Sequence, residues 1–123
     1  MTLGGLENRV RVGLDDTHEV SRWDSSCVLT ALVDAVKRLN SIRPESRYFR
    51  LALYVHDFPV TDKAATGFDE VVARAFTLNI DSRWEQGIVY HAMGRCLEVD
   101  AADTVNFQLA ADFFAKAERI FLS

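Results

Sequence analysis

Residues that cross-link or break the backbone are scarce in this chain. Its 123 residues include two cysteines, two prolines and six glycines. Two cysteines are too few for a disulfide framework or a zinc cage. No repeat and no linker rich in proline, glycine or serine divides the chain, and its length suits one hydrophobic core. We therefore expect a single compact domain over residues 1–123, with both cysteines as buried free thiols.

Clusters of basic residues and long apolar runs are also absent. The formal net charge is −4, from 14 Lys and Arg against 18 Asp and Glu. Binding to phosphate backbones needs clustered basic residues, so we expect no nucleic-acid partner. No run approaches the roughly 20 apolar residues of a membrane-spanning helix, and residues 1–11 lack the pattern of a signal peptide. The sequence therefore predicts a cytoplasmic protein with no membrane partner.

Hydrophobic periodicity predicts a mainly α-helical fold, a bundle of four to five helices. Asp24 precedes one apolar stripe as a helix N-cap, and Ser82 and Glu85 have the spacing of a capping box before another. We therefore expect residues 24–123 to form a helical core. The segments with apolar residues at helical spacing are 26–40, 61 or 66 to 79, 82–98, and 103 or 104 to 121.

Two segments leave strand alternatives open. Residues 8–14 alternate polar and apolar side chains, which is typical of a strand, and we expect residues 1–23 to be an N-terminal arm or strand followed by a loop. Residues 45–58 alternate as well, but the two prolines of the chain flank them as they would flank a helix. Helix is only slightly favoured there. In the strand alternative, about 8–14 pairs with 48–56 as a short two-stranded element.

Recognisable catalytic motifs are absent. The sequence has no phosphate-binding glycine loop, nucleophile elbow, zinc-protease motif or paired C-x-x-C. One acidic cluster offers possible metal ligands within five residues, yet a single loop of this kind is more typical of a solvated turn. We therefore predict no metal and no cofactor. The cluster comprises Asp15, Asp16, His18 and Glu19.

His91 is the most suggestive isolated residue. It lies in the predicted helix 82–98, on the stripe of Gly87 and Gly94, where another backbone can approach closely. A histidine there could face a cleft as an acid or base. The simpler interpretation is that the glycines relieve crowding at a helix crossing and that His91 borders it.

Two other sequence features contain side chains of types that act in catalysis. His56 and Asp57 are adjacent in sequence, but neighbouring side chains point in different directions, so they do not predict a dyad. Cys27 falls near a predicted helix N-terminus, where the dipole lowers a thiol pKa, which makes it a minor nucleophile candidate. We predict no catalytic residue.

The composition favours a non-enzymatic protein–protein interaction module, such as a small acidic chaperone, immunity protein, inhibitor or regulatory adaptor. A basic partner would be attracted by the negative net charge. Aromatic residues and histidine at a helical surface are the binding candidates, because aromatics dominate interface hot spots. These candidates are Trp23, Tyr54, Trp84, Tyr90 and His91.

The sequence also favours a homodimer and leaves a ligand pocket open as an alternative. The number of amphipathic segments favours self-association, with a seam on the last predicted helix at Phe113, Phe114 and Phe121. The alternative function is a small-ligand-binding protein or enzyme with an inter-helical pocket near His91. Convergence of several polar groups on one cavity would favour this alternative.

Overall fold

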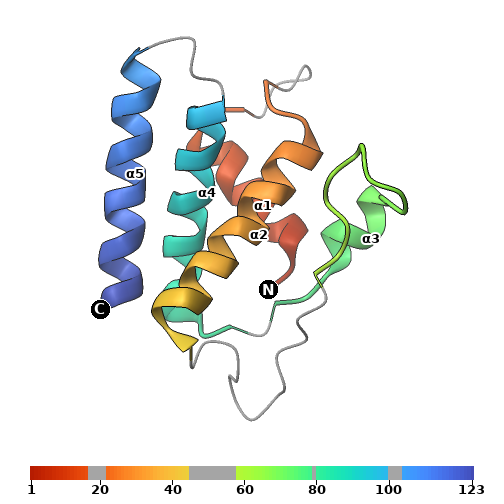
Figure 1. Ribbon diagram of the computed structural model, residues 1–123, viewed down its shortest axis with the longest axis horizontal. Helices are drawn as coiled ribbons and strands as arrows, with labels where there is room; N and C mark the ends of the chain where they lie inside the picture. Colours follow the sequence, from red (N-terminus) through yellow and green to blue (C-terminus); the bar gives the residue numbers. More distant parts are fainter. Residues whose placement is uncertain (17–21, 45–57, 79, 100–103) are drawn as a thin grey trace.

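The computed structural model describes residues 1–16, 22–44, 58–78, 80–99 and 104–123 (Figure 1). The prediction of a mainly α-helical bundle is confirmed, because these residues form five α-helices. The elements are α1 (Leu3–Gly13), α2 (Ser25–Ile42), α3 (Glu70–Ala75), the 3₁₀ helix η2 (Ser82–Trp84), α4 (Glu85–Val99) and α5 (Thr104–Leu122).

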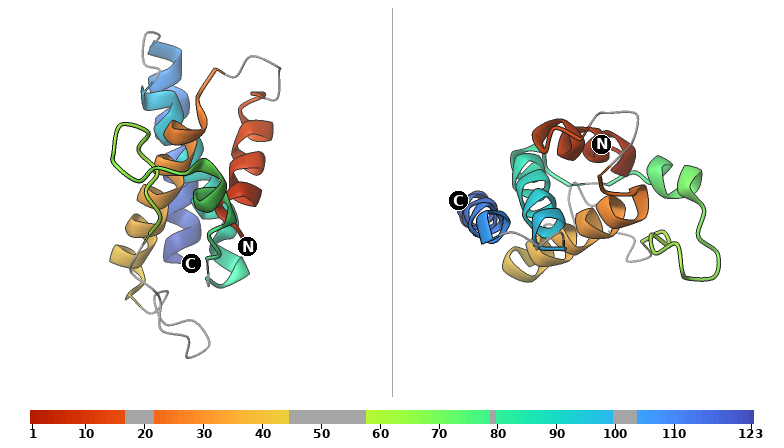
Figure 2. Two further views of the ribbon diagram at one scale, coloured as in Figure 1. Left: turned by 90° about the vertical axis from the view of Figure 1, so that its right-hand side faces the viewer. Right: turned by 90° about the horizontal axis from the view of Figure 1, so that it is seen from above.

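Helix α4 is at the centre of the bundle. Helices α1, α2 and α5 all pack against it, and α3 packs against α1 and α2 away from α5 (Figures 1 and 2). Helix α5 lies at the edge of the molecule, with nearly all of its helix contacts made to α4. Apolar side chains from all five α-helices join one core. Among the described residues, no helix is both long and apolar enough to cross a membrane.

The N-terminal segment is a helix, so the strand or arm predicted over 8–14 is wrong. Thr2 caps α1 by accepting a hydrogen bond from the Gly5 N–H at 3.1 Å. The buried residues Leu3, Leu6 and Val10 then follow each other at intervals of three and four. This helical period, rather than the alternation near its end, determines the structure. The region 45–57, including the suggested strand 48–56, lies outside the described residues.

The helix predicted from residue 61 or 66 to 79 is reduced to α3. Gly67 has a φ of +89°, and the helix begins only after Asp69, whose side chain accepts hydrogen bonds from two N–H groups of the first turn. After Phe76 the chain is extended and pairs with the N-terminus. The Leu3 N–H donates to the Phe76 carbonyl at 3.0 Å, and the Leu78 N–H donates to the Met1 carbonyl at 2.9 Å.

The remaining helices agree with the sequence, with one change at a cap. Asp24 caps α2 as predicted, its carboxylate accepting a hydrogen bond from the Cys27 N–H at 3.0 Å. At the start of η2 the capping residue is Asp81 rather than Ser82, because the Asp81 carboxylate accepts from the Arg83 N–H at 3.0 Å. Helix α5 ends within one residue of the predicted position.

Two glycines let α4 and α5 approach closely. A Cβ atom added to Gly87 would lie 2.6 Å from Cε1 of Phe121, and one added to Gly94 would lie 3.1 Å from the Ala110 carbonyl oxygen. The interpretation that these glycines relieve crowding at a helix crossing is therefore confirmed. His91 lies between them in sequence, with its ring edge-on to Phe114 at a centroid distance of 4.9 Å.

Candidate functional site

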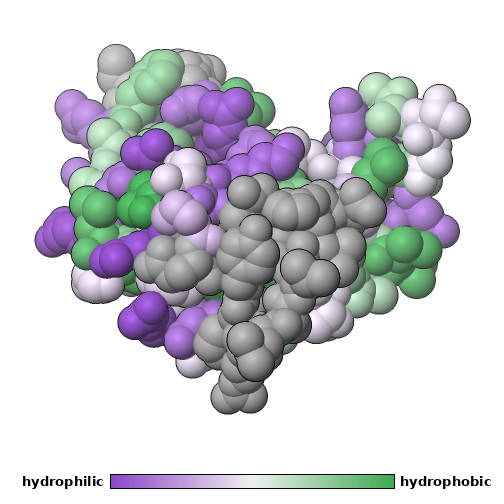
Figure 3. All heavy atoms as spheres, turned by 60° about the horizontal axis from the view of Figure 1, so that its bottom comes forward, coloured by the Kyte–Doolittle hydropathy of each residue, from purple (hydrophilic) through white to green (hydrophobic). Residues whose placement is uncertain are grey.

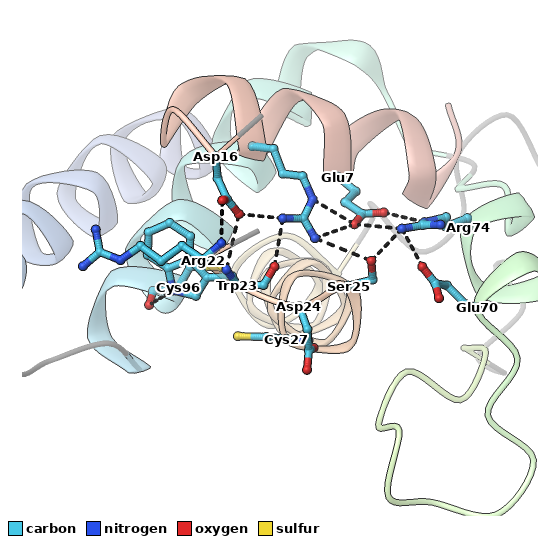
Figure 4. A network of polar contacts seen from close by, with 11 residues as sticks. Glu7, Asp16, Arg22, Trp23, Asp24, Ser25, Cys27, Glu70, Arg74 and Cys96 are labelled. Atoms are coloured by element: carbon cyan, nitrogen blue, oxygen red, sulfur yellow. Dashed lines mark hydrogen bonds and ion pairs between the residues drawn. The ribbon is translucent and has the colours of Figure 1, made fainter. Parts of the chain in front are cut away.

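A buried polar network joins α1 to the start of α2 and to the last turn of α3 (Figure 4). Glu7, which is 2% exposed, accepts hydrogen bonds from Arg11 Nη2 at 3.0 Å and from Arg74 Nε at 2.8 Å. Arg74 Nη2 also donates to Ser25 Oγ at 2.5 Å. Burial opposes ionisation of Glu7, but its hydrogen bonds and charge interactions with the two arginines outweigh burial and lower its pKa. The network therefore stabilises the packing of three helices.

Asp16 belongs to this network. Its carboxylate accepts hydrogen bonds from Arg11 Nη1 at 2.6 Å, the Arg22 N–H at 2.7 Å and the Trp23 N–H at 3.3 Å. It thus fixes the chain entering α2. His18 and Glu19 of the acidic cluster lie outside the described residues. Among the residues that are described, no three His, Cys, Asp or Glu side chains gather as a metal site.

Two of the aromatic binding candidates are core residues, which corrects their assignment to a partner surface. Trp23 is 5% exposed and Trp84 is 2% exposed. Trp23 Nε1 donates a hydrogen bond to the Cys96 carbonyl at 2.9 Å, so this side chain links the entrance of α2 to α4. A third candidate, Tyr54, lies outside the part of the chain that the structure describes.

The predicted dimer seam faces inward and is also corrected. Phe121 is fully buried, and Phe113 and Phe114 are half-buried against the core. Helix α5 instead exposes the apolar residues Phe107, Leu109 and Leu122. Figure 3 shows hydrophobic surface on the side of the molecule occupied by α5 and on the opposite side, where α3 lies. The exposed apolar residues of α3 are Val71 and Val72.

An apolar groove of about 380 Å³ lies between α1 and α4. Val12 and Gly13 of α1 line it on one side, and Val89, Tyr90 and Met93 of α4 line it on the other. Val12 is 69% exposed, although it is a large apolar residue. Helices α1 and α5 both pack on α4 but do not contact each other within the described residues. The groove is therefore open along α4.

One cationic side chain lines this groove, and a second lies beside one of its lining residues. Arg9 of α1 donates a hydrogen bond through Nη2 to Gln86 Oε1 at 2.7 Å. On the side of α5, Lys116 Nζ lies 5.6 Å from the ring centroid of Tyr90 and 5.3 Å from that of Phe113. These two rings are stacked with centroids 5.9 Å apart. The rim thus combines positive charge with aromatic surface.

A second cavity of about 390 Å³ lies between α2, α4 and α5. His91 borders it on a different face of α4 from Tyr90, and its Nδ1 atom is buried without a hydrogen-bond partner in the described structure. Burial lowers the pKa of His91 below its ordinary value, against the opposing charge of Glu118. The cavity is lined by Asp34, Arg38, His91, Arg95, Phe114 and Glu118.

This cavity brings His91 together with Arg95, four residues further along α4. Tyr90 lines the apolar groove, and neither Tyr90 nor Cys27 borders this cavity. His56 and Asp57 lie outside the described residues. Arg38 Nε contacts Glu118 Oε1 at 2.8 Å across the helices, and Arg95 pairs with Glu98 on its own helix. Only some of the candidate polar groups therefore converge on this cavity.

Sequence reasoning missed most of the apolar groove. The apolar spacing over 82–98 does not distinguish Val89 and Met93 from residues that are only core, and Val12 lies in the segment 8–14 whose alternation is typical of a strand. A helical wheel of α1 would place Val12 away from Leu3, Leu6 and Val10, which identifies it as an exposed apolar residue. That signal depends on recognising α1 as a helix.

Comparison with models of protein families, with curated proteins and with solved structures found no match to this chain. The function is therefore inferred from the geometry of the apolar groove and of the cavity beside His91. The groove between α1 and α4 is mainly apolar, whereas the cavity beside His91 is lined mainly by charged side chains.

Proposed function

We propose that this protein is a non-enzymatic interaction module that binds an apolar segment of another protein in the groove between α1 and α4. The observation that carries the proposal is the open apolar groove, with Val12 exposed at its edge. We expect an amphipathic helix as the occupant, because a groove formed by two helices can receive the apolar face of a third. Burial of its apolar side chains would supply most of the binding energy.

The rim supports a partner segment with acidic flanks. Arg9 lines the groove and pairs with Glu85 at 3.4 Å, and Lys116 lies over the ring of Tyr90, so carboxylates beside the apolar residues of a partner would meet mainly the charge of Lys116. The net charge of the whole chain would favour a basic partner, but it acts mainly on the rate of encounter. Charges at the contact determine register and specificity, so we give the rim more weight.

The role of a chaperone, immunity protein, inhibitor or regulatory adaptor is compatible with such a groove. We also propose a cytoplasmic location. The free state of both cysteines supports a reducing compartment, because stable disulfides form mainly in oxidising ones.

The experiment compares two exposed valines. Val12→Glu places a charge at the groove, and Val71→Glu places the same charge on α3, where the valine is 76% exposed. Each tagged protein is cross-linked to partners in its own cell lysate, and the linked peptides are sequenced. We expect Val12→Glu to reduce capture of a specific partner about tenfold, corresponding to about 1.4 kcal/mol, and Val71→Glu to leave it unchanged.

The sequence of the captured segment provides the second criterion. An amphipathic segment with acidic flanks, linked to residues of α1 or α4, would support the proposal. Equal capture by both variants, or greater loss with Val71→Glu, would contradict it. Lys116→Glu provides a further check, because reversing a rim charge should weaken binding of an acidic segment and change its salt dependence.

Self-association is proposed through the outer face of α5 instead of the seam predicted from the sequence. Phe107 and Leu122 are both exposed there. Sedimentation of the wild-type protein at micromolar concentration should give a dimer, and Phe107→Glu should give a monomer. A wild-type protein that sediments only as a monomer would exclude this dimer at that concentration.

A second candidate function is binding of a small zwitterionic molecule beside His91. The specific observation is the cavity that α2, α4 and α5 form, with carboxylates, guanidinium groups and an aromatic ring in its lining. Thermal denaturation with a panel of free amino acids tests this function. Stabilisation of the wild-type protein that is lost in Arg95→Gln would support it, and no shift at millimolar concentrations would oppose it.

A further inference from the structure

The structure brings the two cysteines of the chain together from different helices. Cys27 lies in the first turn of α2, and Cys96 lies in α4 beside Trp23 (Figure 4). Both are free thiols, and they lie close enough for each thiol to shift the pKa of the other. Helices α2 and α4 pack directly against each other, so the approach is fixed by the core.

The two thiols differ in access to solvent. Cys96 is fully buried, whereas Cys27 is only half-buried, which corrects the expectation that both are buried. A small reactant can therefore reach Cys27 first. The Trp23 indole lies beside Cys96 and donates a hydrogen bond of 2.9 Å to its carbonyl.

The surroundings of the two thiols also shift their pKa values in opposite directions. Interaction with the neighbouring Cys96 thiol lowers the pKa of Cys27 to about 7, with burial and the carboxylate of Asp24 opposing the change and the charges of Arg11 and Arg95 assisting it. Interaction with Cys27, together with burial, raises the pKa of Cys96. Cys27 is thus the thiolate and Cys96 the protonated partner.

We propose that Cys27 and Cys96 form a peroxide-reactive pair, in which Cys27 attacks and Cys96 resolves. The Cys27 thiolate attacks one oxygen of hydrogen peroxide, the O–O bond breaks, and hydroxide leaves and becomes water on taking a proton. The Cys96 sulfur then displaces hydroxide from the Cys27 sulfenic acid, and the Cys96 proton leaves with it as a second water. Two thiols are oxidised to one disulfide, and one peroxide is reduced to two waters.

The magnitude of the rate advantage is modest. The lowered pKa raises the thiolate fraction of Cys27 at pH 7 above the roughly 3% of an ordinary thiol with a pKa of about 8.5. The lower basicity of the thiolate reduces its intrinsic nucleophilicity, so the rate of attack rises by less than the thiolate fraction does. Because the second cysteine is adjacent, the product should be the disulfide rather than a more oxidised form of Cys27.

The experiment treats the full chain with near-stoichiometric hydrogen peroxide and maps its peptides without reduction. The wild-type protein should lose both thiols and give a peptide pair linked between Cys27 and Cys96. Cys96→Ser should stop at the Cys27 sulfenic acid, which dimedone labels. Cys27→Ser should leave Cys96 unreacted, and circular dichroism checks that each variant is folded.

Three results would overturn the proposal. One is oxidation of Cys96 in Cys27→Ser as fast as in the wild-type protein. The others are conversion of wild-type Cys27 to its sulfinic acid without a disulfide, and a disulfide formed only between two chains. The map of the wild-type protein decides the question even if a variant fails to fold.

Discussion

Gly87→Ala tests whether the close approach of α4 and α5 stabilises the fold. The added methyl group would lie 2.6 Å from Cε1 of Phe121 and 3.0 Å from Cγ2 of Ile120. The Phe121 ring is fully buried and cannot turn into solvent, so the helices must separate or the ring must leave its rotamer. Such overpacking costs about 1–3 kcal/mol, while alanine in a helix interior contributes about 1 kcal/mol relative to glycine. We expect the net change to range from neutral to about 2 kcal/mol of destabilisation.

Gly5→Ala is the matched control, because its new Cβ would meet only Thr2 Oγ1, at an ordinary 3.4 Å. It should stabilise the protein by about 0.5–1 kcal/mol. Urea denaturation followed by far-UV circular dichroism gives the free energy of unfolding of each variant, and their difference isolates the steric cost. If Gly87→Ala stabilises the protein as much as Gly5→Ala, the close approach does not constrain the helices and the reasoning is refuted.

Three further predictions concern buried polar groups. Glu7→Gln should destabilise the protein at pH 7 by about 1.5–3 kcal/mol, because it removes a charged acceptor of two arginines. The folded pKa of Glu7 is lowered, so its contribution is complete above the unfolded value of about 4.3 and is lost as the pH falls through the folded value. Urea titrations at several pH values should therefore show the deficit of Glu7→Gln shrinking in acid; a constant deficit would contradict this. Trp23→Phe leaves the Cys96 carbonyl without its donor and should cost about 1–3 kcal/mol in the same assay, with no loss arguing against the hydrogen bond. Burial lowers the folded pKa of His91, so NMR titration should give a value below about 6.5, and stability should fall as the pH drops below this unfolded value. That fall should be weaker in His91→Gln.

The helices that could be predicted from the sequence are those whose buried stripe is long and whose cap is explicit. Asp24 stands directly before the apolar stripe of α2, and the stripe of α5 recurs over the whole helix. In both, local preference and tertiary packing require the same conformation. Their bounds in the structure are therefore close to the predicted ones.

The predictions that failed did so where distant contacts decide the conformation. The segment after Phe76 continues an apolar pattern, but its backbone pairs with residues 1–3 and is drawn into an extended form. The N-terminal helix is short, and the alternation of Arg and Val residues at 9–12 is typical of a strand. This alternation outweighed the helical spacing of the buried residues in the prediction. Neither effect is contained in a local window of sequence.

The same limit applies to the aromatic candidates. Residue type favoured Trp23 and Trp84 as interface residues, yet a large aromatic ring is equally suited to a core, where Trp84 is buried even though its Nε1 has no hydrogen-bond partner among the described residues. Trp23 has such a partner in the Cys96 carbonyl. Composition identifies side chains that can bury large areas, but only the packing of α4 determines which of them do so inside the chain.

Helix α4 contributes to both the buried core and the exposed apolar groove of the protein. Gly87 and Gly94 let α5 close on one side of this helix, whereas Met93 packs over Gly13 on the side of α1. Val89 and Met93 therefore belong to the core and also line the groove, so substitutions there would alter stability and binding together. Val12 contributes to the groove while being largely exposed, which makes it the residue whose substitution can separate loss of binding from loss of folding.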